Sequence, residues 1–428
     1  MRDVKIKIHQ LGMIGESEEI TLNRLMIFSG ESGLGKSYLS IICHYIFSVL
    51  LDSHRISSFF DKKGMDFSAM RPAYKGTGVA VTFTKKDFEE WMSKDAVQWL
   101  GYMVGNKDVK ADIEITLPEQ ISEDIVISYK EDMEGLGNEV ETYIQLSLPG
   151  LTYRIKDSGL LWEESPFAFL FRFYLIQEIF EDFKNLAETF IFPPSRGMML
   201  TEDITPTTGM YVEFKKNLHR LVASKPKSIH PSENLTALLK RILDGSIKRK
   251  ENRYIYTTEG EEMPLSAAAA SIRELASIEF LIENSDISKS ALMIDEPEAH
   301  LHPLKQRMMA DIIGALMLSG AYIQVTTHSD YFLRRINELS MLHELYVRTL
   351  KSSLAKYVGI CDRLGMDSEL HIDKSDISAY LLVRDGDHSI AVRQDMSKGV
   401  PFAAFHDALK QTLTIKSELE KELDDADI

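Results

Sequence analysis

The chain has 428 residues, 44 % of them hydrophobic, which is enough for two or three packed domains. Its formal net charge of -16 disfavours a surface that coats nucleic acid indiscriminately, because such binding neutralises phosphates with Lys and Arg. No apolar run approaches the roughly 18 residues of a membrane span, and the N-terminus does not resemble a signal peptide. The two cysteines, Cys43 and Cys361, offer neither a disulfide framework nor a zinc spacing. We therefore expect a cytoplasmic protein that does not contact a membrane.

The first 51 residues predict a strand, a loop and a helix. Alternating apolar residues favour a strand over 4–8, with a second strand near 19–22 to pair with it. The apolar run Leu25–Phe28 is typical of a strand buried on both faces of a parallel sheet, and an apolar helix is predicted over 36–51. The glycine-rich turn between this strand and helix stands in the context that a phosphate loop requires.

This turn fits the pattern G-x-x-x-x-G-K-[ST] at every required place. Its residues are Gly30, Glu31, Ser32, Gly33, Leu34, Gly35, Lys36 and Ser37. In such a loop the backbone N–H groups wrap the phosphates, and the helix N-terminus adds a favourable dipole. We expect Lys36 to reach the outer phosphates and the Ser37 hydroxyl to ligate Mg²⁺. The turn therefore predicts that the chain binds ATP together with Mg²⁺.

Two inserted lobes are predicted in the middle of the chain. Residues 78–157 favour an antiparallel β lobe broken by one helix near 87–100, with strands expected at Val79–Thr84, Ile113–Leu117, Ile125–Tyr129 and Thr142–Leu148. Residues 158–264 favour a helical lobe. One long helix is expected there from Leu160 to Glu188, ended by the prolines that follow Phe192.

Positive charge is concentrated in the helical lobe. Between Phe214 and Arg253, eleven basic residues stand against three acidic ones, which leaves -24 on the rest of the chain. We expect Lys248, Arg249 and Lys250 to form part of a surface that meets nucleic acid or an acidic trigger protein. A solvated loop after a helix would explain these three residues equally well.

Strands and helices alternate again from Ala291, which predicts parallel strands joined by crossovers. The strand that ends at Ile294 is followed by Asp295 and Glu296, at the sheet edge where the phosphate loop is also expected. Asp295 would hold Mg²⁺ through water beside Ser37. Glu296 would orient or deprotonate the attacking water.

Three histidines follow these strands. His328 comes after the strand expected at 322–326, where it could touch the γ-phosphate or serve instead as a helix-capping or structural residue. His300 and His302 are spaced like zinc ligands, but no third ligand is apparent, and a turn before a helix also explains them.

The sequence from Asp295 to Pro303, DEPEAHLHP, followed later by Thr327-His328-Ser329, resembles the ABC-type ATPases of the OLD and SMC-like group, also called AAA family ATPases. The segment Phe192–Arg196 is similar to the proline-and-arginine segment of these proteins. The resemblance covers about residues 1–50 and 190–340. It implies that two such domains sandwich two ATP molecules head to tail.

One segment departs from the family pattern. In that group a serine- and glycine-rich signature caps the γ-phosphate held by the partner, and here the aligned stretch is 265–275, with Ser271 in place of the usual glycine. The resemblance therefore implies hydrolysis that is slow or depends on a partner. A capping box of Ser271 and Glu274 at a helix start is a second interpretation, compatible with the first.

The expected fold class is α/β, a P-loop NTPase with an ABC-type nucleotide-binding domain, an inserted antiparallel β lobe and a helical lobe. The ATPase domain is split over 1–340, in blocks 1–50, 78–157, 158–264 and 265–340. Residues 341–428 form a C-terminal α/β region with a hairpin at 380–393 and an acidic tail.

The functional hypothesis is a Mg²⁺-dependent ATPase that acts as a sensor or regulatory switch, as a homodimer or higher homo-oligomer joined through ATP. Resemblance to the ATPase subunits of the Septu and PARIS anti-phage systems implies a separate nuclease or toxin effector. The alternative is an SMC-like ATPase of DNA repair or maintenance that binds DNA, although no coiled-coil arm is visible in the sequence. A transporter subunit is a weaker hypothesis, because its signature and coupling loop are not recognisable.

Overall fold

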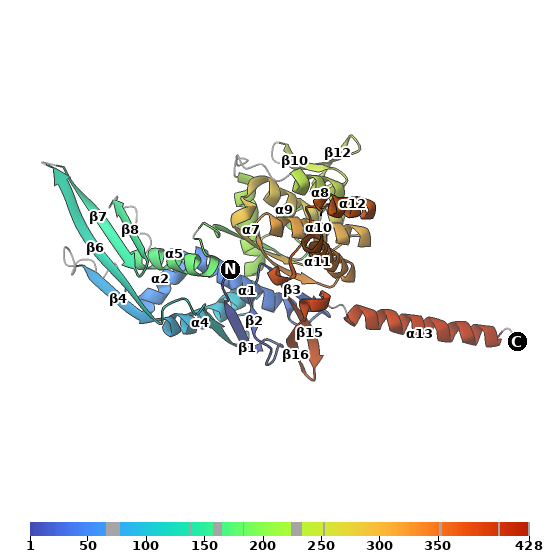
Figure 1. The fold of residues 1–428 in the computed structure, drawn as a ribbon, viewed down its shortest axis with the longest axis horizontal. Helices are drawn as coiled ribbons and strands as arrows, with labels where there is room; N and C mark the ends of the chain where they lie inside the picture. The colour runs from blue at the N-terminus through green and yellow to red at the C-terminus, as the bar shows by residue number, and fades with distance from the viewer. Residues whose placement is uncertain are drawn as a thin grey trace.

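The computed structural model describes the chain except at residues 66–77, 137–138, 157–164, 183, 224–232, 251–252, 351–352, 401–402 and 427–428. At its centre is a six-stranded sheet (Figure 1). In spatial order its strands are β16 (His388–Arg393), β15 (Ile377–Asp385), β3 (Leu25–Gly30), β14 (Tyr322–Thr327), β13 (Ser290–Asp295) and β9 (Glu188–Phe192). The strands from β15 to β9 run parallel, and β16 forms an antiparallel hairpin with β15, which confirms the hairpin predicted from the sequence.

The central strands β3, β13 and β14 are buried along their whole length, because helices cover both faces of the sheet. Met26 and Phe28 of β3 pack into the core on one face, with α1 (Lys36–Leu51) and α5 (Pro166–Phe180). Leu25 and Ile27 pack into the core on the other face. The helices there are α9 (Ala270–Asn284), α10 (Pro303–Leu318) and α11 (Asp330–Leu350).

A smaller antiparallel sheet lies beside α1, in the order β2-β1-β5. Its strands are β1 (Lys5–Leu11), β2 (Ile20–Thr21) and β5 (Ala111–Thr116). The pairing of β2 with β1 confirms the prediction for the N-terminus. The strand expected at Ile113–Leu117 was wrongly placed in the inserted lobe. Ile113 and Ile115 lie opposite Ile8 and Ile6 of β1 and bury their side chains with them.

The inserted antiparallel lobe is confirmed, with strand order β4-β6-β7-β8, and its long strands project to one end of the molecule (Figure 1). Its elements are α2 (Ser53–Lys62), β4 (Val79–Thr84), α4 (Lys85–Val104), β6 (Asp124–Leu136), β7 (Glu139–Leu148) and β8 (Leu151–Lys156). Helix α4 begins at a capping box in which Thr84 and Asp87 each satisfy the other's backbone N–H. The ring of Phe83 on β4 contacts both Phe59 of α2 and Phe171 of α5, and its contact with Phe171 joins the lobe to the body.

The long helix predicted from Leu160 to Glu188 is wrong at its C-terminal end. Within the described residues α5 ends at Phe180, where Glu181 takes the left-handed conformation with φ 69°. Glu188–Phe192 is instead the parallel edge strand β9, paired with β13. Aromatic and β-branched residues in this stretch favour a strand, and pairing with β13 outweighs the apolar pattern that suggested a helix. Residues 160–164 lie outside the described residues.

The lobe expected to be helical contains strands as well as helices. Besides α5, its described helices are α6 (Met198–Thr201), α7 (Gly209–Ala223) and α8 (Glu233–Leu243). They are followed by a three-stranded antiparallel sheet of β10 (Ser246–Lys250), β11 (Arg253–Thr258) and β12 (Glu261–Pro264). Lys248, Arg249 and Lys250 therefore lie on an edge strand, and the loop considered as the alternative is wrong.

The C-terminal part adds α12 (Leu354–Leu364), the hairpin and α13 (Ala403–Ala426). Tyr380 of β15 accepts a hydrogen bond at its hydroxyl from Thr21 N–H, 2.9 Å away, and so ties the hairpin to the N-terminal sheet. Among the helices that the structure describes, none is long and apolar enough to cross a membrane.

Candidate active site

The phosphate loop joins the end of β3 to the start of α1, and three of its glycines have positive φ, Gly30 at 130°, Gly33 at 78° and Gly35 at 95°. A Cβ atom on Gly30 would lie 2.4 Å from the carbonyl oxygen of Leu382 on β15. One on Gly35 would lie 2.8 Å from Ile14. Gly33 has no atom within 4 Å of such a position. Two of the glycines thus serve close packing of the loop, and the third leaves space above it.

Lys36 is the first residue of α1, and only 6 % of its surface is exposed. Its Nζ donates to the carbonyl oxygens of Gly30 (3.0 Å) and Glu31 (2.7 Å). Burial lowers the pKa of Lys36, while Glu296 and Asp295 oppose that shift. Two backbone carbonyls of the loop therefore hold this ammonium. Neutral carbonyls hold a positive charge less strongly than a phosphate would.

Asp295 lies at the end of β13, and 3 % of its surface is exposed. Its Oδ1 accepts hydrogen bonds from Ser37 Oγ, 3.2 Å away, and from the hydroxyl of Thr326 on β14. Burial raises the pKa of Asp295, and these two hydrogen bonds lower it. The structure thus brings together the two residues that the sequence assigned to Mg²⁺. A carboxylate oxygen and a hydroxyl oxygen that lie about 3 Å from each other are suited to occupy adjacent coordination positions on this hard cation.

Glu296 follows Asp295 with φ 48°, a left-handed conformation uncommon for a residue other than glycine. The turn is held by its N–H, which donates to the carbonyl oxygen and the hydroxyl of Thr326. Glu296 Oε1 lies 3.3 Å from His328 Nε2. This hydrogen bond is the main cause that lowers the pKa of Glu296. The carboxylate therefore stays ionised and can accept a proton from water.

His328 follows β14 and does not cap a helix, so the capping interpretation is wrong. Ser329 caps α11 instead, because its Oγ accepts from Phe332 N–H at 3.0 Å. The backbone N–H of His328 donates to Glu298 Oε1 at 2.7 Å, and Thr327 Oγ1 donates to the same oxygen at 2.6 Å. Glu298 is buried, which raises its pKa. It thus fixes the backbone that carries His328.

His300 and His302 lie in the turn before α10. His302 is its N-cap residue, accepting from Leu304 N–H at 3.4 Å, which supports the interpretation as a turn before a helix. Within the described ranges, no group of three or more His, Cys, Asp or Glu side chains is placed to hold a metal ion.

Arg196 is fully buried behind the end of β13. Its guanidinium donates to the carbonyl oxygens of Glu274 (3.2 Å), Pro193 (3.3 Å) and Asp295 (3.4 Å). One charge thus connects the segment after β9, helix α9 and the end of β13. Burial lowers the pKa of Arg196, and the Glu274 carboxylate, 3.9 Å from Nε, opposes this. The sequence pointed to this segment only by resemblance and assigned Arg196 no role.

Ser271 lies inside the first turn of α9, whose N-cap residue is Ala269 without a side-chain cap. The capping box expected from Ser271 and Glu274 is therefore wrong. Ser266, Ala267 and Ala269 at this helix start are exposed. Ser271 is not among the residues that line the phosphate-loop cavity of the same chain.

A cavity of about 600 Å³ lies over the phosphate loop. One wall is formed by loop residues with Glu296 and His328. The opposite wall comes from Met13 and from the turn between α4 and β5, including Asn106, Asp108 and Lys110. No local pattern in the sequence indicates this second wall, because it depends on the pairing of β5 with β1.

Comparison with known proteins gives one family match. The AAA ATPase domain family matches residues 170–333, which include Asp295, Glu296 and His328 and leave the phosphate loop outside. No curated protein matches the chain.

Three solved structures are similar over most of the chain. The SMC head bound to the C-terminal winged-helix domain of ScpA has 12 % identity and a TM-score of 0.39, covering 93 % of this chain and 98 % of its own. The SMC head domain from Thermotoga maritima has 11 % identity and a TM-score of 0.33, covering 92 % of this chain and 100 % of its own. The third structure is the SMC head with an extended coiled coil bound to the C-terminal domain of ScpA from Pyrococcus furiosus. It has 11 % identity and a TM-score of 0.37, covering 98 % of this chain and 100 % of its own. With TM-scores below 0.5, these likenesses support no conclusion about function.

The chain has the α/β fold of a P-loop NTPase, with an inserted antiparallel sheet and a helical part. Parallel strands end in a phosphate loop and an acidic pair at one edge of the sheet. This arrangement and the family match support an ATPase.

The hydrogen bond between His328 and Glu296 predicts a change in pH dependence. Because His328 lowers the pKa of Glu296, His328→Ala should raise that pKa and move the acidic limb of the ATPase pH–rate profile to higher pH. His328→Gln, which keeps a donor, should move it less. A profile whose acidic limb coincides with that of the parent would show that His328 does not set the protonation of Glu296.

Proposed function

We propose that the chain binds ATP with Mg²⁺ at the phosphate loop and hydrolyses it. The observation that carries this proposal is the pairing of Ser37 with Asp295, 3.2 Å apart, at the edge of the cavity that Glu296 also lines. Ser37 and Asp295, the latter through water, would hold the cation, which neutralises charge on the phosphates when bound. Lys36 would exchange its two carbonyl partners for phosphate oxygens.

Glu296 would act on the attacking water. Its carboxylate lies on the same wall of the cavity as the phosphate loop and is kept ionised by His328. It would orient the water and accept its proton as the new P–O bond forms and the bond to the leaving diphosphate breaks. His328 would then face the γ-phosphate beside the base. Both residues are rigidly held, because Thr326 and Glu298 fix their backbones.

A second copy would complete the site from the open side of the cavity. The start of α9, with its small exposed residues, would approach the partner's γ-phosphate, as the sequence resemblance implies for this segment. Ser271 stands where that group has glycine, so we expect slow turnover unless a partner stimulates it. ATP binding would then close a dimer, and hydrolysis would release it.

Such a dimer fits a regulatory switch better than a metabolic enzyme. We place it in a multi-component anti-phage defence system with a separate nuclease or toxin effector, on the strength of the sequence resemblance to the Septu and PARIS ATPases. A nuclease or toxin gene beside this one would support that role, and recombination genes would support the alternative in DNA repair.

Replacing Lys36 tests nucleotide binding. Lys36→Ala should weaken ATP binding at least a hundredfold in calorimetry, since a charge-assisted contact to phosphate is lost. Circular dichroism should show the parent's fold. The two carbonyls that lose Lys36 as a partner belong to a loop that borders the cavity, where water can replace the ammonium. Lys86→Ala, on the exposed face of α4, serves as the matched control and should bind ATP like the parent. Parent-like affinity of Lys36→Ala would refute the proposal.

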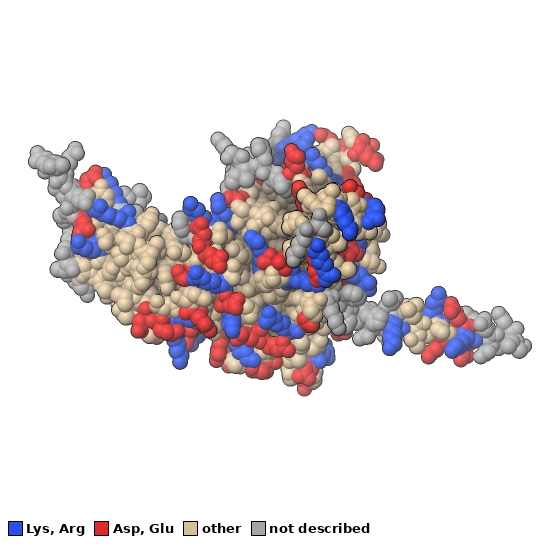
Figure 2. Space-filling view, in the orientation of Figure 1, with Lys and Arg blue, Asp and Glu red and all other residues tan. Residues whose placement is uncertain are grey.

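The alternative function, DNA binding, rests on the basic strand β10. Lys248, Arg249 and Lys250 are all exposed. Their charge is partly compensated, because Lys250 pairs with Glu262 at 2.7 Å and Arg249 donates to the Val222 carbonyl at 3.4 Å. Figure 2 shows acidic and basic side chains intermixed over β10 and its neighbours. This mixture of charges favours a small contact site for an anionic partner over a continuous DNA-binding face.

Reversing these three charges to Glu should weaken binding of duplex DNA or an acidic partner at least tenfold at low salt, with ATP hydrolysis by the free protein near normal. Gel shifts at several salt concentrations measure the first effect. Lys86→Glu/Lys94→Glu/Lys107→Glu changes net charge equally on exposed residues of another region and should bind like the parent. Equal binding by the parent and the β10 variant would exclude the site.

A further inference from the structure

Helix α13 projects from the body as a separate arm (Figures 1 and 2). All residues from 410 to 422 are exposed. Among them Leu413, Ile415 and Leu419 are exposed by 57 %, 49 % and 58 %. Helical stability in proteins comes mostly from packing of an apolar face, so an arm of this kind needs a surface that covers its apolar side chains.

A second uncovered apolar surface lies on α11 and α12. A groove of about 430 Å³ is lined there by apolar side chains, with charged groups at its rim. Met341 on α11 and Leu364 on α12 are exposed by 65 % and 62 %. Of the 17 large apolar side chains exposed in the described residues, ten lie on α11, α12 or α13. Apolar exposure so concentrated on three helices marks an interaction site.

The charges of the groove match those of α13. On the groove helix α11, Glu344 is followed one turn later by Arg348, 3.8 Å apart, and it also forms an ion pair with Lys374 of the same chain. On α13 the order is reversed, with Lys416 followed one turn later by Glu420, 3.6 Å apart. If α13 lies parallel to α11, Lys416 comes beside Glu344 while Glu420 comes beside Arg348. The antiparallel arrangement would bring like charges together.

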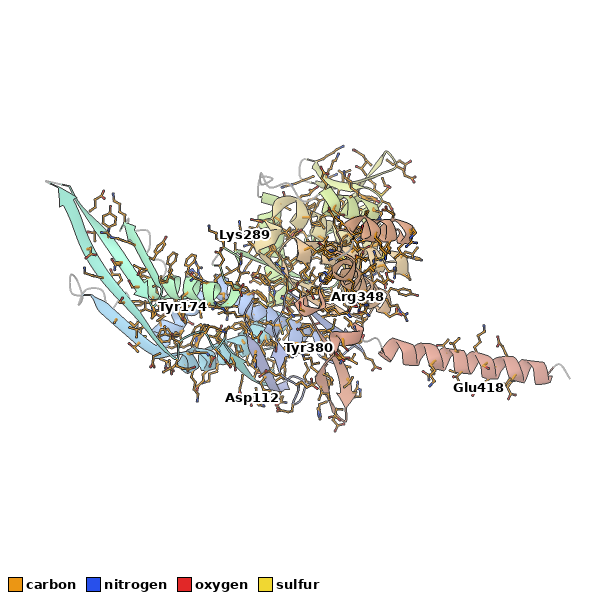
Figure 3. The ribbon with its side chains drawn as sticks, viewed as in Figure 1. Asp112, Tyr174, Lys289, Arg348, Tyr380 and Glu418 are labelled. Atoms are coloured by element: carbon orange, nitrogen blue, oxygen red, sulfur yellow. The ribbon has the colours of Figure 1, made fainter. Side chains whose placement is uncertain are left out.

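Figure 1 shows α13 pointing away from the body of its own chain, which is held at Val400 shortly before the helix begins. Asn337, one turn before Met341 on α11, exchanges hydrogen bonds with Val400, donating to its carbonyl at 2.9 Å and accepting from its N–H at 2.5 Å. From this anchor α13 extends outward, and Figure 3 shows Glu418 on the arm and Arg348 on the body. At about 1.5 Å per residue, its 24 residues reach about 36 Å. That is far enough to meet another molecule.

We propose that α13 of one copy docks in the groove between α11 and α12 of a second copy, parallel to the second copy's α11. None of the residues named for this contact lines the cavity over the phosphate loop. Docking therefore needs no nucleotide, and the contact goes beyond the ATP-closed dimer proposed above. It would keep two copies together while ATP opens and closes their heads.

Light scattering of the full-length chain without nucleotide tests this proposal. The parent should rise from 48.7 kDa towards twice that mass as its concentration increases. Leu413→Asp/Leu419→Asp should associate at least tenfold more weakly. Gln411→Asp/Thr414→Asp adds the same two charges on the other face of α13 and should associate like the parent. A parent that stays monomeric at all concentrations would overturn the proposal, as would equal association of the two variants.

A charge swap tests alignment and distinguishes a second copy from the same chain. Glu344→Lys/Arg348→Glu and Lys416→Glu/Glu420→Lys should each associate several-fold more weakly than the parent. A mixture of the two should recover parent-like association, because each groove then meets a matching helix from the other variant. A mixture that remains as weak as its components would overturn the proposal. Lys36→Ala should associate like the parent, so failure of the ATP proposal would leave this result unaffected.

Discussion

The parallel pairing of β3, β14 and β13 determines where every candidate catalytic group lies. Ser29 pairs with Thr327, and Thr326 with Asp295, so the three strands end together at one edge of the sheet. A shift of one residue in either pairing would turn alternate side chains to the opposite face. The register is fixed by two apolar cores, one on each face, which take alternate residues of the same strands. The packing of the two cores therefore also fixes the relative positions of the residues of the site.

Burial of charge at this edge explains the density of its hydrogen bonds. Lys36, Arg196, Asp295 and Glu298 are all less than 9 % exposed, and each is held by named partners. A buried charge is costly unless it is hydrogen-bonded, and a hydrogen bond to a charged group typically contributes about 1.5 to 3 kcal/mol. The network keeps Asp295 and the backbone of His328 in place in the absence of ligand. When a phosphate and a cation bind, the side chains of the site would give up some of these hydrogen bonds and contact the ligands from positions that they already hold.

Local pattern and strand order were enough to predict most of the nucleotide domain. The phosphate loop, the acidic pair and the buried strands have short-range signatures, so their elements could be placed correctly. The edge strand β9 could not, because Glu188–Phe192 becomes a strand only through pairing with β13. For a similar reason, the sequence did not indicate the residues that hold the site in place, Thr326, Glu298 and Arg196. Their role depends on contacts across 29 to 99 positions of the chain, which no local pattern records.

The central claim is that Glu296 removes the proton of the attacking water at a bound ATP. Glu296→Gln keeps the shape of the side chain and removes its basicity, so it should bind ATP with Mg²⁺ as tightly as the parent. Single-turnover hydrolysis should fall at least a hundredfold. Measuring both quantities on the same preparation separates binding from chemistry. Tight binding with lost hydrolysis is the predicted result, and hydrolysis at the parent rate would contradict the account.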